Sequence, residues 1–254
     1  MSLLPFSAVL EHSAMLTDAV KTFTWRIEKD STFQYQPGQF ITLHLEHQGK
    51  LLKRSYSIAN FPQENNTIEF AASFVPDGPA SQLLFALKPG ATLSMTGPFG
   101  RLLLPTDFAP VQRFILIGTG TGVTPYRSML PLLHRFLMQE PKLSVHFLQG
   151  TRLQQEGLYV DEFLQFCEEH PQQARFSLCL SREPRENTYA QHIHLGYVQS
   201  LLAQLTLHPN QDRVYLCGNP GMIDDCFQYL NQQNFESKAI IREKYISSGS
   251  TALK

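Results

Sequence analysis

The second half of the chain alternates short apolar segments with longer segments of helical periodicity, and this alternation limits the fold more than any other feature. The apolar segments carry few charges, as strands buried on both faces do. The strand–helix pairs are 113–118 with 125–137, 143–150 with 158–170, 174–181 with 196–205, and 213–218 with 222–233, and a last strand spans 238–246. This order predicts a doubly wound parallel α/β sheet with helices on both faces.

The first half has a different period. From residue 6 to about 104 the chain shows short alternating or β-rich runs, namely 21–29, 39–47, 54–60, 67–75 and 92–99. Turn formers separate them, and a short helix is expected at 79–87. The pattern predicts an antiparallel β-barrel or sandwich. Pro105 and Pro110 flank a short polar connection, so we expect a two-domain protein divided into 1–107 and 108–254.

Charge and composition exclude several classes of function. The net charge is −1, which offers no field that collects nucleic acid or anionic lipid. No window approaches 18 apolar residues, and the first residues contain Pro5 and Glu11 without a basic leader, so we expect a cytoplasmic protein. The four cysteines are scattered at Cys167, Cys179, Cys217 and Cys226. This spacing fits neither a zinc site nor an iron–sulfur cluster, and no metal is expected.

A glycine-rich turn follows the first strand of the α/β half. In GTGTGVTP, Gly118, Gly120 and Gly122 stand between an apolar strand and a helix expected to begin near Thr124 and Pro125. Glycines allow the backbone to approach a pyrophosphate closely, and the helix N-terminus offers free N–H groups. A tight turn without a ligand is the alternative, but the position on the first strand favours a dinucleotide. The expected contacts also include Thr119 and Thr121.

Cations at the next two strand ends bear on the choice of nucleotide. Arg152 follows the second strand, where many NAD sites have an acid, and Ser181 and Arg182 follow the third. Guanidinium groups bind phosphate in a bidentate way, which favours NADP over NAD. The alternative is that these are ordinary exposed arginines at strand ends. Arg185, in the loop that follows, is a weaker candidate for contact with the 2′-phosphate.

The fourth strand ends in CGNPGM, a second turn that permits close approach. Cys217, Gly218 and Met222 are the candidates here. The alternative for Cys217 is a small buried residue at the end of a strand, which is the more common role of a lone cysteine.

The segment LLKRSYSIAN crowds two cations, two serines and a tyrosine into Lys53 to Ser57. β alternation sends Arg54 and Tyr56 to one face and Ser57 to the other. A plain sheet protein has no need for such a group.

These motifs together resemble the ferredoxin–NADP reductase superfamily. The matching segments are RSYS (54–57), PDGPASQLLFALKPG (76–90), GPFGRLLLP (97–105), GTGTGVTP (118–125), GTR, SRE, CGNPGM and REKY (242–245). Each motif alone is weak evidence, but their order along nearly the whole chain is strong.

The resemblance implies an FAD-binding barrel and an NADP-binding α/β domain, with the following roles. Arg54 would pair with the FAD pyrophosphate, Tyr56 would lie against the isoalloxazine ring and Ser57 near flavin N5, and Ser55 of the same motif is also expected to bind the cofactor. The segment GPAS, with Gly78, Ala80 and Ser81, resembles the second FAD phosphate site.

The family likeness also implies a group around the nicotinamide. Cys217 would lie near nicotinamide C4, and Glu243 and Tyr245 match the family's near-terminal acid and aromatic residue. Residues 246–254 extend beyond that tyrosine, as in bacterial members.

The implied activity is hydride transfer between NADP(H) and FAD, with single electrons passing to or from ferredoxin or flavodoxin. A monomer is expected, and Lys50, Lys53 and Arg101 are candidates for the acidic partner's docking rim. Two alternatives stay open: an NADH-preferring reductase component of an oxygenase, which the segment 190–202 resembles, and a non-catalytic FAD electron-transfer subunit.

Overall fold

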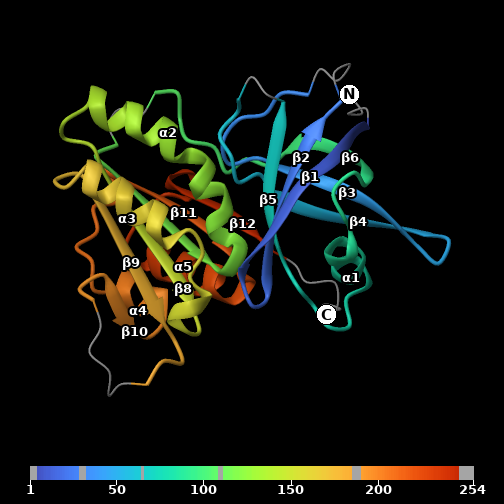
Figure 1. Cartoon of the computed structure of the whole chain (residues 1–254). Coiled ribbons are helices and arrows are strands. Elements are labelled where there is room, and N and C mark those ends of the chain that lie inside the picture. Colours follow the sequence, from blue (N-terminus) through green and yellow to red (C-terminus); the bar gives the residue numbers. More distant parts are fainter. Residues whose placement is uncertain (1–4, 29–32, 64–65, 108–110, 185–189, 246–254) are drawn as a thin grey trace. The chain divides into compact units, whose positions relative to one another are not determined.

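A computed structural model describes residues 5–28, 33–63, 66–107, 111–184 and 190–245. The chain forms two compact units (Figure 1). One contains Met1–Leu104 and Thr124–Met129, and the other contains Pro105–Val123 and Leu130–Lys254. Each unit is described by itself below.

The first unit is a six-stranded antiparallel sheet with the strand order β4-β3-β6-β1-β2-β5. Its elements are β1 (Phe6–Thr17), β2 (Val20–Ile27), β3 (Phe40–His47), β4 (Lys50–Ser57), β5 (Thr67–Ser73), α1 (Pro79–Ala86) and β6 (Thr92–Phe99). A bridge between Ile58 and Phe70 links the end of β4 to β5, which are the two edge strands. The sheet therefore curls toward closure, as the sequence predicts.

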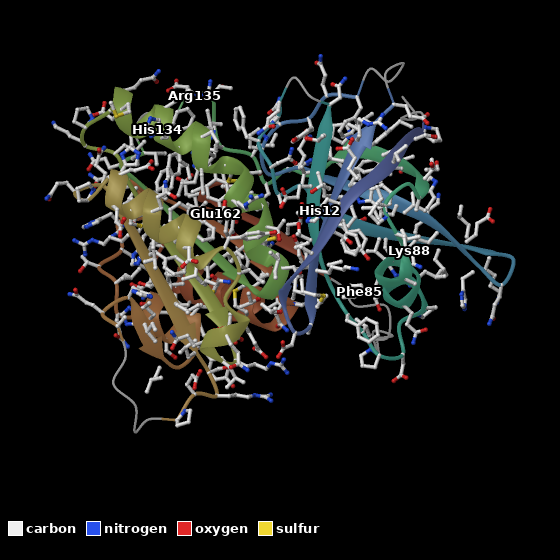
Figure 2. The ribbon with its side chains drawn as sticks, viewed as in Figure 1. His12, Phe85, Lys88, His134, Arg135 and Glu162 are labelled. Carbon is white, nitrogen blue, oxygen red and sulfur yellow. The ribbon has the colours of Figure 1, made fainter. Side chains whose placement is uncertain are left out.

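Aromatic side chains fill this unit. Phe23, Trp25 and Phe70 are fully buried, and the Phe70 ring centroid lies 5.5 Å from Phe23 and 6.3 Å from Trp25. Helix α1 packs on this core through Phe85, which is labelled in Figure 2. The Phe85 ring centroid lies 5.9 Å from that of Phe23, and the Phe85 carbonyl accepts a hydrogen bond from Lys21 Nζ. Phe70 of this core also stacks on Tyr56, with ring centroids 4.8 Å apart, so core packing helps to hold the strand that carries Arg54 and Tyr56.

The longest strand, β1, is absent from the runs that the sequence analysis singled out. Its pairing with β2 shifts register between Leu10 and His12 and again between Met15 and Thr17. Each bulge places two residues opposite one and reverses the inside–outside alternation beyond it. The period of two is therefore lost, and with it the sequence signal.

The second unit is a six-stranded parallel sheet with the order β10-β9-β8-β7-β11-β12. Its strands are β7 (Arg113–Thr119), β8 (Ser144–Thr151), β9 (Ala174–Leu180), β10 (Ile193–Leu195), β11 (Asp212–Gly218) and β12 (Ile240–Lys244). Its helices are α2 (Thr124–Gln139, whose first turns belong to the first unit), α3 (Val160–Glu169), α4 (Val198–Leu202) and α5 (Pro220–Gln232). The doubly wound α/β prediction is confirmed.

Helices cover both faces of this sheet (Figure 1), and neighbouring residues of a central strand face opposite sides. Ile115 and Ile117 belong to a cluster built with residues of α4 and α5. On the other face, Phe114 packs against Phe136 of α2, and Phe147 lies 4.9 Å from Phe163 of α3. Strands buried on both faces explain the uninterrupted apolar runs.

Two elements of this unit differ from the expectation. The helix expected over 196–205 is α4, which spans only Val198–Leu202 and ends in tight turns to Gln204 and Leu205. The short edge strand β10 was not expected at all. Three residues are too few to show a period.

No helix in the described part of the chain is long and apolar enough to cross a membrane. The four cysteines are free, and Cys179, Cys217 and Cys226 are buried.

Candidate functional site

The carboxyl edge of the parallel sheet has its switch point between β7 and β11. The chain runs from β7 outward to β8 on one side and returns to β11 on the other. Ligands of open α/β sheets bind at such a point, outside the carboxyl ends of the strands. The two turns singled out in the sequence, after Gly118 and after Cys217, both begin there, because Cys217 pairs with Gly118 across the two strands.

The glycines of the first turn permit contact between these two strand ends. A Cβ on Gly122 would lie 2.3 Å from the Cys217 carbonyl oxygen and 2.8 Å from Gly218 Cα. Gly218 has a φ of +117°, and a Cβ there would lie 2.6 Å from the Thr119 carbonyl oxygen. Only glycine fits either position, so the backbones of the two glycine turns are in direct contact.

The start of α2 offers an anion-binding end. A 3₁₀ turn, Gly120–Val123, runs directly into α2, and Pro125 occupies its first turn, where a missing N–H costs nothing. Thr124 is 1% exposed, and its Oγ1 has no hydrogen-bond partner among the residues that the structure describes. A buried hydroxyl without a partner, at a helix end with free N–H groups, fits a phosphate oxygen.

Asn219 is a residue of this edge that the sequence analysis missed. Its Oδ1 accepts a hydrogen bond from Met222 N and caps α5, and its own N–H donates to Thr119 Oγ1 at 2.9 Å. Asparagine immediately before a proline is an N-cap signal that was present in the sequence. Asn219 therefore ties the second turn to the first.

The structure brings Cys217, Glu243 and Tyr245 together. Cys217 pairs with Glu243 between β11 and β12, and Tyr245 N–H donates to the Gly218 carbonyl at 2.8 Å. Complete burial, followed by the charge of Glu243, raises the pKa of the Cys217 thiol well above its usual value, although hydrogen bonds from the Tyr245 side chain and the Gly218 backbone oppose this. Such an environment favours the neutral thiol over the thiolate, which is the nucleophilic form of cysteine.

Arg152, Ser181 and Arg182 also meet at this edge. Ser181 N–H donates to the Thr151 carbonyl and Arg182 N–H to the Arg152 carbonyl, at 3.0 and 2.9 Å. The Arg182 side chain is exposed and the Ser181 side chain is half-buried. The ends of β8 and β9 thus present the residues expected at a 2′-phosphate side by side.

Two carboxylates that the sequence analysis missed lie in the same place. Glu156 accepts hydrogen bonds from Arg152 Nη2 at 2.6 Å and from Arg152 Nε at 3.1 Å, and Glu183 accepts one from Gln154 N–H. Partial burial alone would raise the pKa of Glu156, but the bonds from the Arg152 side chain and backbone lower it overall. The spacing of four between Arg152 and Glu156 was the available signal.

In the first unit, β4 alternates as the sequence indicates. Arg54 and Tyr56 are half-buried, while Lys53 and Ser55 are exposed and Ser57, the last residue of the strand, is buried. The Tyr56 ring lies 4.8 Å from Phe70 in a stacked arrangement, and burial raises the pKa of its phenol to about 12, against the nearby Arg54.

Arg54 has no acidic partner in the described part of the chain. Its guanidinium donates to the Lys53 carbonyl at 2.8 Å. Arg54 is thus a half-buried cation with no carboxylate partner among the described residues, and it lies on the same face of β4 as Tyr56. One side of the Tyr56 ring is stacked on Phe70. This pair fits an anionic, planar ligand such as a flavin nucleotide.

The turn before α1 differs in detail from the expectation. The Ser81 hydroxyl accepts a hydrogen bond from Val75 N–H at 3.0 Å, and its single hydrogen lies within reach of the Val75 and Gly78 carbonyl oxygens, each 2.9 Å from Oγ. It therefore shapes the turn, and the groups that remain for a phosphate are the first-turn N–H groups, including that of Ala80. A Cβ on Gly78 would lie 2.9 Å from Val75 Cβ, so glycine is needed here too.

Arg185 and the extension 246–254 lie outside the described residues.

Comparisons with known proteins point in one direction. Two family models match the chain, the oxidoreductase FAD-binding domain over residues 7–103 and the oxidoreductase NAD-binding domain over residues 116–228. Ferredoxin–NADP reductase B of Sorangium cellulosum is 33% identical over 178 residues, which are 70% of each chain.

A second relative and a solved structure widen the comparison. The reductase component of propane 2-monooxygenase from Mycolicibacterium goodii is 27% identical over 217 residues, which cover 85% of this chain and 60% of that protein. A ferredoxin NADP⁺ reductase from Neisseria gonorrhoeae, solved with bound FAD and NADP, has the same fold, with a TM-score of 0.80 at 22% identity, covering 94% of this chain and 98% of that one.

Proposed function

We propose that the chain, which belongs to the ferredoxin–NADP reductase superfamily, is itself a ferredoxin–NADP reductase. It would transfer hydride between NADP(H) and FAD and pass single electrons to or from ferredoxin or flavodoxin. The observation that carries this proposal is the direct contact between the two glycine turns at the switch point, followed along the chain by the buried Thr124 hydroxyl.

The FAD site is proposed on the first unit. Arg54 would bind the pyrophosphate, Tyr56 would pack against the flavin ring and Ser57 would lie at its reactive edge, while Ser55 would contribute to the same FAD site. The turn of Gly78, Ala80 and Ser81 would hold a phosphate through its N–H groups. The free charge of Arg54 and the Phe70 backing of Tyr56 support these roles.

The nucleotide site is proposed at the carboxyl edge of the parallel sheet. The turn from Gly118 to Pro125 would hold the pyrophosphate, and Gly218 and Met222 would line the opposite side. Arg182 and Ser181, with Arg152, would meet the ribose phosphate. The closeness of these groups supports the assignment.

When bound, nicotinamide and flavin together supply hydride and one-electron chemistry. The residues of the chain bind and orient, and none has to act as an acid or base. Cys217, uncharged and buried, would shape the nicotinamide pocket by its volume. Glu243 and Tyr245, which neighbour the Cys217 thiol, would keep it in position.

Lys50, Lys53 and Arg101, all exposed in the first unit, would form the rim for an acidic electron-transfer protein. Ferredoxin and flavodoxin are both proposed as partners.

Reconstitution with FAD tests the proposed function. We expect the chain to bind FAD, to lose the flavin absorbance when NADPH is added without oxygen, and to reduce ferredoxin or flavodoxin. A protein that takes up no FAD would contradict the enzyme assignment. A protein that reduces artificial acceptors but neither ferredoxin nor flavodoxin would contradict the proposed partners only.

A second candidate is an NADH-preferring reductase component of an oxygenase. The observation in its favour is that Glu156 neutralises Arg152 and that Glu183 adds a further carboxylate nearby. A 2′-phosphate is attracted less to such a balanced group than to two free arginines.

Arg182→Ala decides between the two nucleotides. We expect the KM for NADPH to rise about tenfold, because a charge-assisted bond to the 2′-phosphate is lost, and the KM for NADH to change less than about twofold. Steady-state assays with an artificial acceptor measure both. Arg175→Ala, near the amino end of β9, the strand that Arg182 follows, is the matched control and should change neither value. Equal increases for both nucleotides would contradict the role.

Glu156→Gln should act in the opposite direction. It keeps the size of the side chain but removes the charge that holds Arg152, so the ratio of kcat/KM for NADPH to that for NADH is expected to rise about threefold or more. A ratio that stays within the experimental error would mean that Arg152 takes no part in the nucleotide site.

A further inference from the structure

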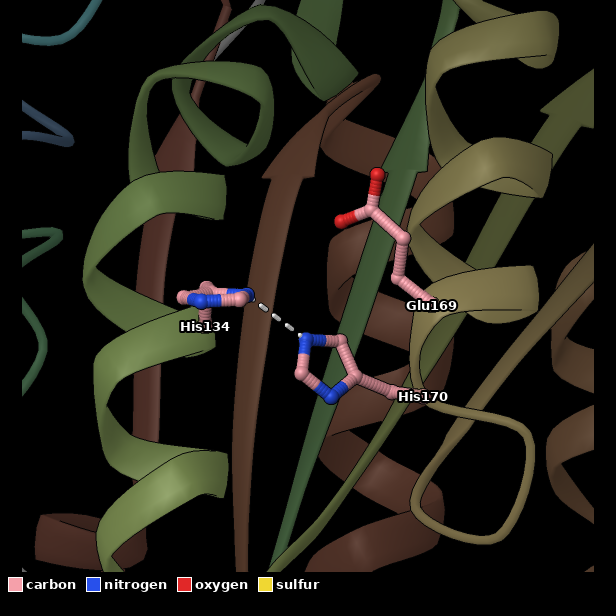
Figure 3. A group of neighbouring side chains, drawn as sticks. All are labelled: His134, Glu169 and His170. Atoms are coloured by element: carbon pink, nitrogen blue, oxygen red, sulfur yellow. Dashed lines mark hydrogen bonds between the residues drawn. The ribbon is translucent and has the colours of Figure 1, made fainter.

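A histidine pair lies in the second unit, and neither histidine belongs to the proposed FAD or nucleotide site. His134 projects from α2, and His170 follows the last residue of α3. His134 Nδ1 and His170 Nε2 are 2.9 Å apart, and Figure 3 shows the two imidazoles facing each other between the helices. His134 is exposed, whereas His170 is only 5% exposed.

A carboxylate completes the group. Glu169 precedes His170, and its side chain reaches from α3 toward α2 (Figure 3). One ligand atom from each of His134, Glu169 and His170 lies within 4.8 Å of the others. Gln165 Nε2 donates to Glu169 Oε1 at 3.1 Å, which holds the carboxylate near the histidines.

The backbone around His170 is held firmly. Its N–H donates to the Phe166 and Cys167 carbonyls, and its carbonyl accepts from Gln173 N–H and Ala174 N–H. The Phe166 ring centroid lies 4.8 Å from that of His170 and limits the tilt of the imidazole.

Gln173 fixes this turn against α2. Its Nε2 lies within 3.2 Å of the carbonyl oxygens of Leu137, Glu140 and Leu143, at the end of α2 and just beyond it. The spacing between the two histidines is therefore set by tertiary contacts and does not depend on their own hydrogen bond.

This geometry is close to what a tetrahedral ion requires. Zn–N bonds of about 2.0–2.1 Å place two ligating nitrogens about 3.3 Å apart, so the pair needs to open by only a few tenths of an ångström. The Glu169 carboxylate is exposed and can turn about its single bonds to become the third ligand. Two imidazoles and one carboxylate, with an open position for water, form a ligand set that zinc accepts.

We propose that His134, Glu169 and His170 form a zinc site that joins α2 to the end of α3. Binding neutralises the single carboxylate and replaces the hydrogen bond between the imidazoles with two bonds to the metal. Because the ion bridges two helices of one unit, it stabilises that unit, and this role is independent of the proposed electron transfer.

Calorimetric titration of the full, chelator-treated chain with Zn²⁺ tests the site. We expect one Zn²⁺ per chain and a rise in melting temperature on its addition, with no comparable response to Mg²⁺. His134→Gln, which removes an exposed ligand and leaves the buried His170 in place, should weaken binding at least about tenfold and abolish the rise in melting temperature. Glu169→Gln should weaken binding to a smaller extent.

His12→Gln, at an exposed histidine of the first unit, is the matched control and should bind as the unchanged chain does. Binding within about twofold of the unchanged chain in His134→Gln would overturn the proposal, and the histidine pair would then be a hydrogen bond between helices only. A chain that binds no Zn²⁺ would overturn it as well.

Discussion

Gly122→Ala is expected to abolish binding of the nicotinamide nucleotide and to lower the melting temperature of the protein. The added methyl group would lie 2.3 Å from the Cys217 carbonyl oxygen and 2.6 Å from its carbonyl carbon. Both atoms are backbone, and β11 is held between β7 and β12, so the strand cannot move aside. The turn itself must shift away, and the start of α2 shifts with it.

The size of the effect follows from the cost of overpacking. Such collisions cost about 1–3 kcal/mol, which corresponds to a fall in melting temperature of about 5 °C in a chain of this size. Nucleotide binding should suffer more than stability, because the phosphate-binding N–H groups lie in the segment that moves. Fluorescence titration with NADP⁺ and a thermal melt measure the two effects.

Gly120→Ala separates collision from backbone strain. Gly120 has a φ of +53°, but a Cβ there would meet nothing within 4 Å. Alanine at this position costs only its left-handed conformation, about 1 kcal/mol. If Gly122→Ala melted no lower than the unchanged chain, the close contact between the two turns would not exist in solution.

The parts of the fold that could be predicted are those with an undisturbed period. Strand β7 shows as an apolar run because both its faces are buried, and the glycines that follow it are contiguous in sequence. Strand β1 could not be predicted, since two bulges reverse its alternation. A period of two is visible in a sequence only where the register of the strand is constant, and a bulge interrupts that register.

In the candidate site, too, only groups of residues that are contiguous in the sequence could be predicted from local patterns. Gly118 to Gly122 form a local motif, whereas the meeting of Cys217 with Glu243 depends on the register of two parallel strands. Nothing local to either residue specifies that register. The histidine pair of α2 and α3 is a stronger case, because His134 and His170 are brought together only by the packing of two helices.

Local reading also missed contacts that were visible in principle. Glu156 stands four residues after Arg152 and pairs with it through two hydrogen bonds. Because Arg152 follows a strand, no turn of helix is expected after it, and its charge is expected to be free. A short 3₁₀ turn, Gln154–Glu156, brings the carboxylate back to the guanidinium.

Arg54→Ala is expected to weaken FAD binding about ten- to hundredfold, the largest effect proposed for the first unit. Charge-assisted hydrogen bonds contribute about 1.5–3 kcal/mol each, and tenfold in affinity corresponds to about 1.4 kcal/mol. Arg54 forms no ion pair with a described residue, so its loss leaves no buried carboxylate unpaired. The change should therefore alter affinity for FAD without a matching loss of stability in the apoprotein.

Lys53→Ala is the matched control for that result. Lys53 is the adjacent cation on the same strand, but alternation places it on the exposed face. A general attraction of FAD to positive charge would weaken binding in both variants alike, whereas a pyrophosphate contact on one face weakens it only in Arg54→Ala. Equilibrium dialysis of the two apoproteins against FAD distinguishes these cases, and equal losses would remove Arg54 from the proposed site while leaving its strand in place.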